Sequence, residues 1–175
     1  MSVTVWQVMA LRAAKNAGMD VPREAIDDAV GYIKRLYSPG DSKQPAAYGG
    51  FGYRGPGRDT STTAEGLLAL QVCGQYDAPE TLGAAAKLLR DGVEERERWF
   101  HYTIYYYAQG MYQRGGRYAE EGRRVVGQLL LPRQSREGWW ESDSREERDA
   151  GKIYATSLAM LSLAVKNHFL PIYQR

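Results

Sequence analysis

The apolar and polar residues of this chain follow two patterns, and both are typical of helices. In the first, apolar residues recur at steps of three and four, which predicts a helix with one buried face. The first pattern covers residues 22–37, 79–90 and 118–131. In the second, apolar residues occur nearly all the way round, which predicts a helix buried on most sides. The second pattern covers residues 3–17, 61–72, 99–113 and 153–166.

The two kinds of segment alternate along the chain, which indicates a repeat of helical hairpins. A turn with a glycine followed by Asp-x-Pro occurs at residues 18–22 and returns at 74–79. Units repeated in this way bury their faces against their neighbours. We therefore expect one all-α domain over residues 1–175, with about seven main helices in an inner and an outer layer. No segment of useful length has the alternation of a β-strand.

Composition excludes some classes of protein but does not identify a function. The net charge is +2 and the basic residues form no block, so a nucleic-acid interface is not indicated. No apolar run approaches the roughly 20 residues of a membrane span. Cys73 is the single cysteine, so the chain forms no internal disulfide and its redox compartment stays open.

Two loop motifs give the chain a family resemblance. Gly-Gly-Phe-Gly at residues 49–52 is similar to a loop of protein prenyltransferase β subunits and squalene cyclases. The sequence at 134–140 resembles the Gln-Trp motif of triterpene cyclases, in which Gln and Trp tie an outer helix to the next loop. The motif residues are Gly49, Gly50, Phe51, Gln134, Gly138, Trp139 and Trp140.

The chain thus resembles the terpenoid cyclase and protein prenyltransferase superfamily, over nearly its whole length. The resemblance implies an α/α toroid-type repeat, and the number of helices implies about half of a full toroid. The catalytic residues of the family do not carry over. Ser61 occupies the place of the cyclase proton donor before Thr-Ala-Glu at 63–65, and no Asp-x-Asp-Asp motif occurs. Cys73 lacks the Asp and His that hold zinc in prenyltransferases, so we expect no metal and no cofactor.

The best candidates for ligand contact lie on one side of the helix predicted at 99–113. They are Tyr102, Tyr105, Tyr106 and Gln109. Aromatic rings attract cations and suit polyprene or carbocation ligands. The simpler interpretation is that these side chains pack one inner helix against another.

Two residues are weak candidates for catalysis. Asp59 is either an acid or a favourable charge at a helix N-terminus. His101 is either a base or a structural histidine without an orienting partner. We expect Glu65 to complete a capping box that begins at Thr62, and residues 142–149 to form a solvated loop.

These observations favour a non-catalytic repeat module that binds a hydrophobic small molecule or a peptide, or acts as a scaffold. The alternative is a terpenoid cyclase or prenyltransferase whose catalytic acid lies in a missing N-terminal half, so whether the chain is an enzyme stays open. The helices at 3–17 and 153–166 are apolar on most sides. We expect a second copy of the chain or that missing half to cover them, with the tail at 169–173 covering part.

Overall fold

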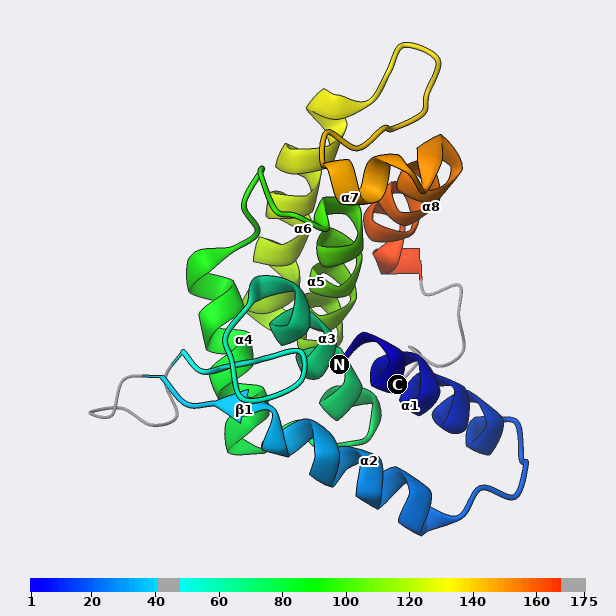
Figure 1. Ribbon diagram of the computed structural model, residues 1–175, viewed down its shortest axis with the longest axis vertical. Helices are drawn as coiled ribbons and strands as arrows, with labels where there is room; N and C mark the ends of the chain where they lie inside the picture. The colour runs from blue at the N-terminus through cyan, green and yellow to red at the C-terminus, as the bar shows by residue number, and fades with distance from the viewer. Residues whose placement is uncertain (41–47, 168–175) are drawn as a thin grey trace.

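The computed structural model describes residues 1–40 and 48–167, and these are mostly helical (Figure 1). The main helices are α1 (Ser2–Asn16), α2 (Arg23–Arg35), α3 (Thr60–Val72), α4 (Pro79–Asp91), α5 (Phe100–Arg114), α6 (Gly116–Leu130) and α8 (Gly151–Leu163). The shorter elements are β1 (Tyr37–Ser38), β2 (Gly50–Phe51), α7 (Arg145–Arg148) and the 3-10 turns at Leu131–Arg133 and Val165–Asn167. The all-α prediction is confirmed, and each main helix coincides with a predicted segment. The tail at 169–173 lies outside the described residues.

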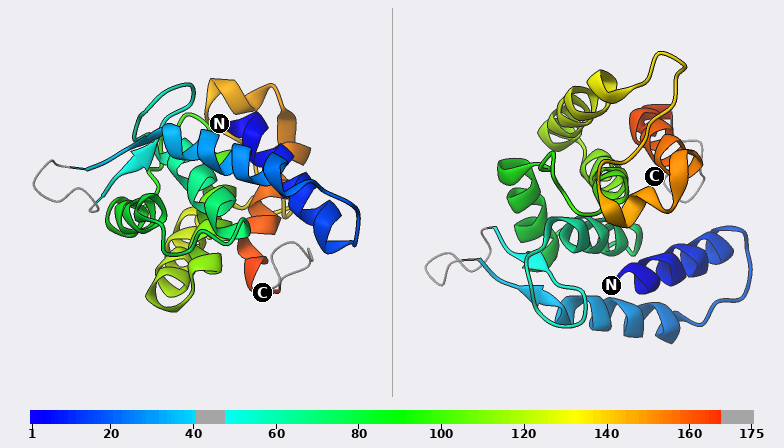
Figure 2. Two further views of the ribbon diagram at one scale, coloured as in Figure 1. Left: turned by 90° about the horizontal axis from the view of Figure 1, so that it is seen from below. Right: turned by 45° about the horizontal axis from the view of Figure 1, so that its top comes forward.

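The helices are arranged in two layers along an open arc (Figure 2). In the inner layer α3 packs between α1 and α5, and α5 packs between α3 and α8. In the outer layer α2, α4 and α6 each pack against the inner helix that precedes them. Strands β1 and β2 pair antiparallel, with Tyr37 opposite Phe51, and lie beside α3 and α4. Closure into a toroid stays a prediction.

Burial agrees with the apolar pattern at the centre of the arc but not at its ends. In α3 every residue from Thr62 to Val72 is buried, and α5 is almost as deeply buried. The terminal helices α1 and α8 were predicted to be apolar on most sides, and within this chain they leave apolar side chains uncovered, as expected for the two ends of an open arc. On α1 Trp6 is 50% exposed, and on α8 Ile153 is 85% exposed, because each terminal helix has an inner neighbour on one side only.

The repeated turns end the inner helices in the same way. Gly18 after α1 and Gly74 after α3 both have a positive φ, near 80°, which a side chain rarely adopts. At each turn the N–H of the glycine donates to the carbonyl three residues before it. The N–H of the next residue donates to the carbonyl five residues before it, as Met19 does to Ala14 and Gln75 does to Leu70. These are Schellman bonds, which satisfy the last carbonyls of the helix. The glycine of the repeat is therefore a helix terminator.

Candidate functional site

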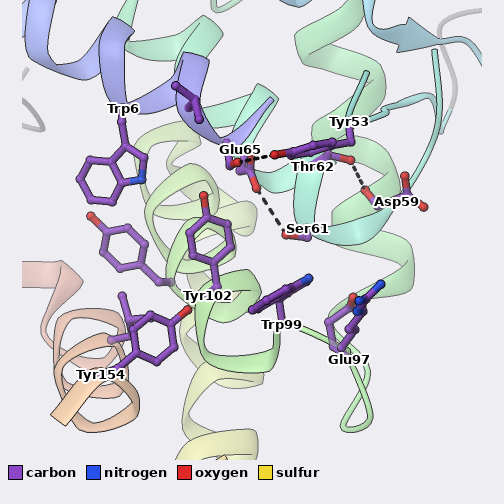
Figure 3. Close-up of a pocket in the computed structure, with 15 residues that line it drawn as sticks. Trp6, Tyr53, Asp59, Ser61, Thr62, Glu65, Glu97, Trp99, Tyr102 and Tyr154 are labelled. Atoms are coloured by element: carbon purple, nitrogen blue, oxygen red, sulfur yellow. Dashed lines mark hydrogen bonds between the residues drawn. The ribbon is translucent and has the colours of Figure 1, made fainter. Parts of the chain in front are cut away.

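A pocket of about 980 Å³ lies on the inner side of the arc, where α1, α3 and α5 begin (Figure 3). Helix α8 and the loops before α3 and α5 complete its wall. Its aromatic side chains are Trp6, Tyr53, Trp99, Tyr102, Tyr105 and Tyr154. Its polar side chains are Ser2, Asp59, Ser61, Thr62, Glu65, Glu97 and Arg98. This volume is at the upper end of the roughly 300–1,000 Å³ of ligand pockets.

Glu65 places a buried carboxyl group in this pocket. The residue is 1% exposed, and its Oε1 accepts a hydrogen bond from Ser61 at 3.4 Å. Among the described residues Oε2 has no hydrogen-bond partner. Burial raises the pKa of Glu65 to about 7, although the amino terminus, Ser61 and the Tyr102 hydroxyl each lower it. At neutral pH the pocket therefore holds a carboxyl group that both gains and loses a proton readily.

The capping box expected for Glu65 is wrong. The residue before the first turn of α3 is Asp59, whose side chain makes no capping hydrogen bond. Thr62 instead donates to the carbonyl of Phe51 at 2.5 Å, and Thr63 accepts from the N–H of Phe51 at 3.1 Å. These bonds tie the loop before α3 to the helix, which leaves Glu65 to face the pocket.

The tyrosine face of α5 contributes to the pocket with its first turns only. Tyr102 and Tyr105 line the pocket, and Tyr102 points its hydroxyl toward Glu65 (Figure 3). Burial and the nearby Glu65 raise the pKa of Tyr102 to about 12, so this hydroxyl stays protonated at neutral pH. Tyr106 and Gln109 are buried and lie outside the pocket lining. A helix rises about 1.5 Å per residue, so residue 109 lies roughly 10 Å further along the axis than residue 102.

Tyr106 supports the pocket from behind. Its ring is fully buried and makes edge contacts with three aromatic rings of the lining. The centroid distances are 4.8 Å to Tyr102, 5.0 Å to Tyr105 and 6.4 Å to Trp6. Aromatic pairs prefer this geometry, so Tyr106 fixes the orientation of the rings that a ligand would touch.

The two weak catalytic candidates lie in different surroundings. Asp59 is exposed and lines the rim of the pocket. His101 is 1% exposed and does not line it. The expectation that His101 lacks an orienting partner is wrong, because its Nδ1 lies 3.0 Å from Oε2 of Glu147. Its Nε2 is buried and has no hydrogen-bond partner among the residues that the structure describes, so the imidazole is part of the interior.

Glu147 is the main residue that the sequence reasoning missed. It lies on α7, within the segment expected to be a solvated loop, yet it is 1% exposed. Its carboxylate accepts the backbone N–H groups of His101 at 3.1 Å and Tyr102 at 3.0 Å, and the Ser142 hydroxyl at 2.8 Å. The Glu147 side chain thus caps the N-terminus of α5, although it lies 46 residues after His101 in the sequence. Ser144 and Glu147 have the spacing of a capping box, which is the signal that could have predicted α7.

Hydrogen bonds keep Glu147 ionised. Burial by itself raises the pKa of this carboxyl, but the donors on His101, Tyr102 and Ser142 outweigh burial and hold the pKa below its usual value. The position of Tyr102 at the pocket therefore depends on a charged group behind the start of α5.

The glycine motif at 49–52 packs against the chain itself. A Cβ at Gly49 would meet the Tyr37 hydroxyl, and a Cβ at Gly50 would lie 2.5 Å from Thr63 Oγ1. Phe51 is fully buried, and its ring lies 2.5 Å from where a Cβ of Gly66 would be. None of the three motif residues lines the pocket; the loop contributes through Tyr53, which follows them.

The Gln-Trp-like segment joins α6 to α8 and also lies away from the pocket lining. Trp140 is 3% exposed. Its indole N–H donates to the Leu130 carbonyl at 2.8 Å, and its backbone N–H donates to the Thr156 hydroxyl at 3.0 Å. Gln134 donates to the carbonyl of Gly138 at 3.1 Å, as the spacing predicts. Trp139 is half-buried and stacks under the Lys152 ammonium, 3.6 Å from the ring centre. The packing predicted for this motif is confirmed for Trp140.

Neither a metal-binding cluster nor a membrane-spanning helix occurs in the part of the chain that the structure describes. No three His, Cys, Asp or Glu side chains there converge on a metal position. Burial raises the pKa of Cys73 to about 11, so its thiol stays protonated at neutral pH. Every helix in the described ranges is too short or too polar to cross a bilayer.

Comparisons with protein-family models, with curated proteins and with solved structures find no match to this chain.

Proposed function

We propose that this chain is a toroid-type repeat module that binds a hydrophobic small molecule in its central pocket. The observation that carries the proposal is the pocket at the centre of the arc, with six aromatic side chains around one buried carboxyl group. Ligand sites in proteins are typically concave and mostly apolar, with a few polar groups that orient the ligand. A small molecule fits this description better than a peptide, because the aromatic side chains surround one volume and do not follow an extended groove.

The test compares two tryptophan variants in the binding of a neutral apolar probe. N,N-dimethyloctanamide is titrated into the protein and the heat of binding is measured. Trp6→Ala removes a pocket ring that is already half exposed and should weaken binding about tenfold, which corresponds to about 1.4 kcal/mol. Trp139→Ala removes a half-buried ring outside the pocket and should leave the affinity unchanged. Equal losses in both variants, or no saturable binding by the unmodified protein, would contradict the proposal.

The second candidate is an acid-catalysed cyclase, and Glu65 is the observation that favours it. Glu65 lies one helical turn from Ser61, which occupies the place of the family's proton donor, and the two side chains are hydrogen bonded. A carboxyl group with a pKa of about 7 still carries its proton in part at neutral pH and can donate it to an oxygen atom such as that of an epoxide. Incubation with oxidosqualene followed by mass spectrometry tests this candidate. Cyclised product that disappears in Glu65→Gln would favour the enzyme over the binding module.

A further inference from the structure

We propose that the ligand of this pocket is an organic cation, an apolar amine whose ammonium group lies between the Glu65 carboxylate and the aromatic rings of Trp6 and Tyr102. This inference rests on the proposed binding function and adds the chemical class of the ligand. Three features of the described residues carry it: the unpaired oxygen of Glu65, the rings around it and the charge of the pocket wall.

The first feature is the hydrogen-bonding state of Glu65. Its Oε2 is buried and receives no hydrogen bond within the described ranges of the chain. A buried acceptor without a donor is unfavourable, and an ionised one more so. A protonated amine supplies both the missing donor and the opposite charge. A hydrocarbon ligand would supply neither.

The second feature is the set of aromatic rings that line the same pocket. Trp6 from α1, Tyr102 from α5 and Trp99 before α5 reach the same pocket as Glu65 (Figure 3). The faces of such rings attract alkylammonium groups, and cages of aromatic residues recognise methylated amines. The apolar chain of the amine would then lie toward Tyr154 and Leu158 on α8.

The third feature is the sign of the charge around the pocket. Asp59, Glu65 and Glu97 line it, and Arg98 is the one basic side chain among the described lining residues. Arg98 is already paired with Glu146 at 2.9 Å.

The other groups that face Glu65 leave the carboxyl groups in the majority. The ammonium group of Met1 keeps its positive charge while it donates to the Tyr53 carbonyl at 2.8 Å, and it lowers the pKa of Glu65, but it is one charge against the three carboxyl groups of the lining. Tyr102 and Tyr106 on α5 have raised pKa values and stay neutral. An anionic ligand would therefore meet more carboxylates than free cations.

The experiment uses three probes that share an eight-carbon chain and differ in charge. They are N,N-dimethyloctylamine, which is protonated at pH 7.5, the neutral N,N-dimethyloctanamide, and the octanoate anion. Calorimetric titration of the full chain should give at least tenfold tighter binding for the amine than for the amide, with octanoate the weakest. Glu65→Gln should abolish the preference for the amine over the amide.

A matched variant separates the local contact from net charge. Glu95→Gln removes one carboxylate from an exposed side chain outside the pocket and should keep the preference for the amine. Equal binding of amine and amide, or a preference for the amine that survives in Glu65→Gln, would overturn the proposal that the ligand is a cation bound by Glu65. The proposed binding function would stay intact. Failure of all three probes to bind would overturn the binding function and the ligand class together.

Discussion

A carboxyl group that folding removes from water has two ways to lower its energy, and this chain contains one example of each. Glu147 stays ionised and collects donors from His101, Tyr102 and Ser142. Glu65 collects fewer donors: Ser61 bonds Oε1 at 3.4 Å and Tyr102 points its hydroxyl toward the carboxyl group (Figure 3), so burial prevails and the pKa rises to about 7. A group left in the second state is less stable when ionised, which is the usual property of residues that bind or react rather than support a fold.

The raised pKa of Glu65 should make folding stability depend on pH. The folded protein holds this proton up to a pKa of about 7, whereas the unfolded chain releases it near the usual 4.5. The proton therefore favours the folded state at low pH, and this contribution is lost as pH rises from about 4.5 to 7, by about 3 kcal/mol. Glu65→Gln has no such proton to lose. Urea denaturation measures the free energy of unfolding of both proteins at pH 4.5 and pH 8. Between these two pH values the variant should gain about 3 kcal/mol relative to the unmodified protein. A difference between the two proteins that is the same at both pH values would contradict the raised pKa of Glu65.

Glu147 should show the opposite dependence. Glu147→Gln should lower the free energy of unfolding at pH 7 by about 3 kcal/mol, because one partner of a buried hydrogen-bonded pair is lost. The pKa of Glu147 is depressed, so its contribution is present above about pH 4.5 and disappears as pH falls through the lower folded value. The loss of stability in the variant should therefore shrink in acid, and urea denaturation at pH 7 and pH 3.5 measures this.

The control variant is Glu146→Gln, which breaks a partly exposed ion pair with Arg98. It should lower the free energy of unfolding by less than about 1 kcal/mol. Equal losses in the two variants would refute the role of Glu147.

At the scale of elements, local patterns predicted the helices, and long-range packing determined what they expose. The segments that became α3 and α5 differ little in pattern from those that became α1 and α8, yet only the central pair is buried on all sides. Periodicity reports how apolar a face is, not whether another helix covers it. The place of Glu65 in the pocket escaped prediction for the same reason: Glu65 has the spacing of a capping residue, and only the approach of α1 and α5 makes it a pocket residue.

The junction of α6 and α8 should depend on one of the two adjacent tryptophans. Trp140→Ala should lower the free energy of unfolding by about 3–5 kcal/mol, because it removes a buried ring and the indole bond to Leu130. Trp139→Ala should cost about 1 kcal/mol, because that ring is half exposed and stacks on Lys152. Chemical denaturation of the two variants checks the difference. Similar losses would mean that Trp140 does not join the helices as described.

At the scale of the whole molecule, the arc leaves apolar side chains uncovered at both ends. Val3 and Trp6 on α1 and Ile153 and Met160 on α8 are at least half exposed. Exposed apolar surface of this kind favours association. We predict that the chain dimerises at micromolar concentration and that Met160→Glu converts it to a monomer.

Light scattering measures this association directly. Leu82→Glu introduces the same charge on α4, away from the ends of the arc, and should leave the dimer intact. A monomer before any substitution, without binding of a hydrophobic dye, would contradict the prediction.

If the pocket on the inner side of the arc receives a ligand, the four tryptophans of the chain report on it directly. Trp6 and Trp99 line the pocket, whereas Trp139 and Trp140 lie outside it. The indole N–H signals of ¹⁵N-labelled protein are followed by NMR during titration with N,N-dimethyloctylamine, after assignment by single Trp→Phe variants. Ligand binding in the pocket should shift the Trp6 and Trp99 signals in a saturable way and leave those of Trp139 and Trp140 unmoved. Shifts confined to Trp139 and Trp140, or no saturable shift at all, would contradict it.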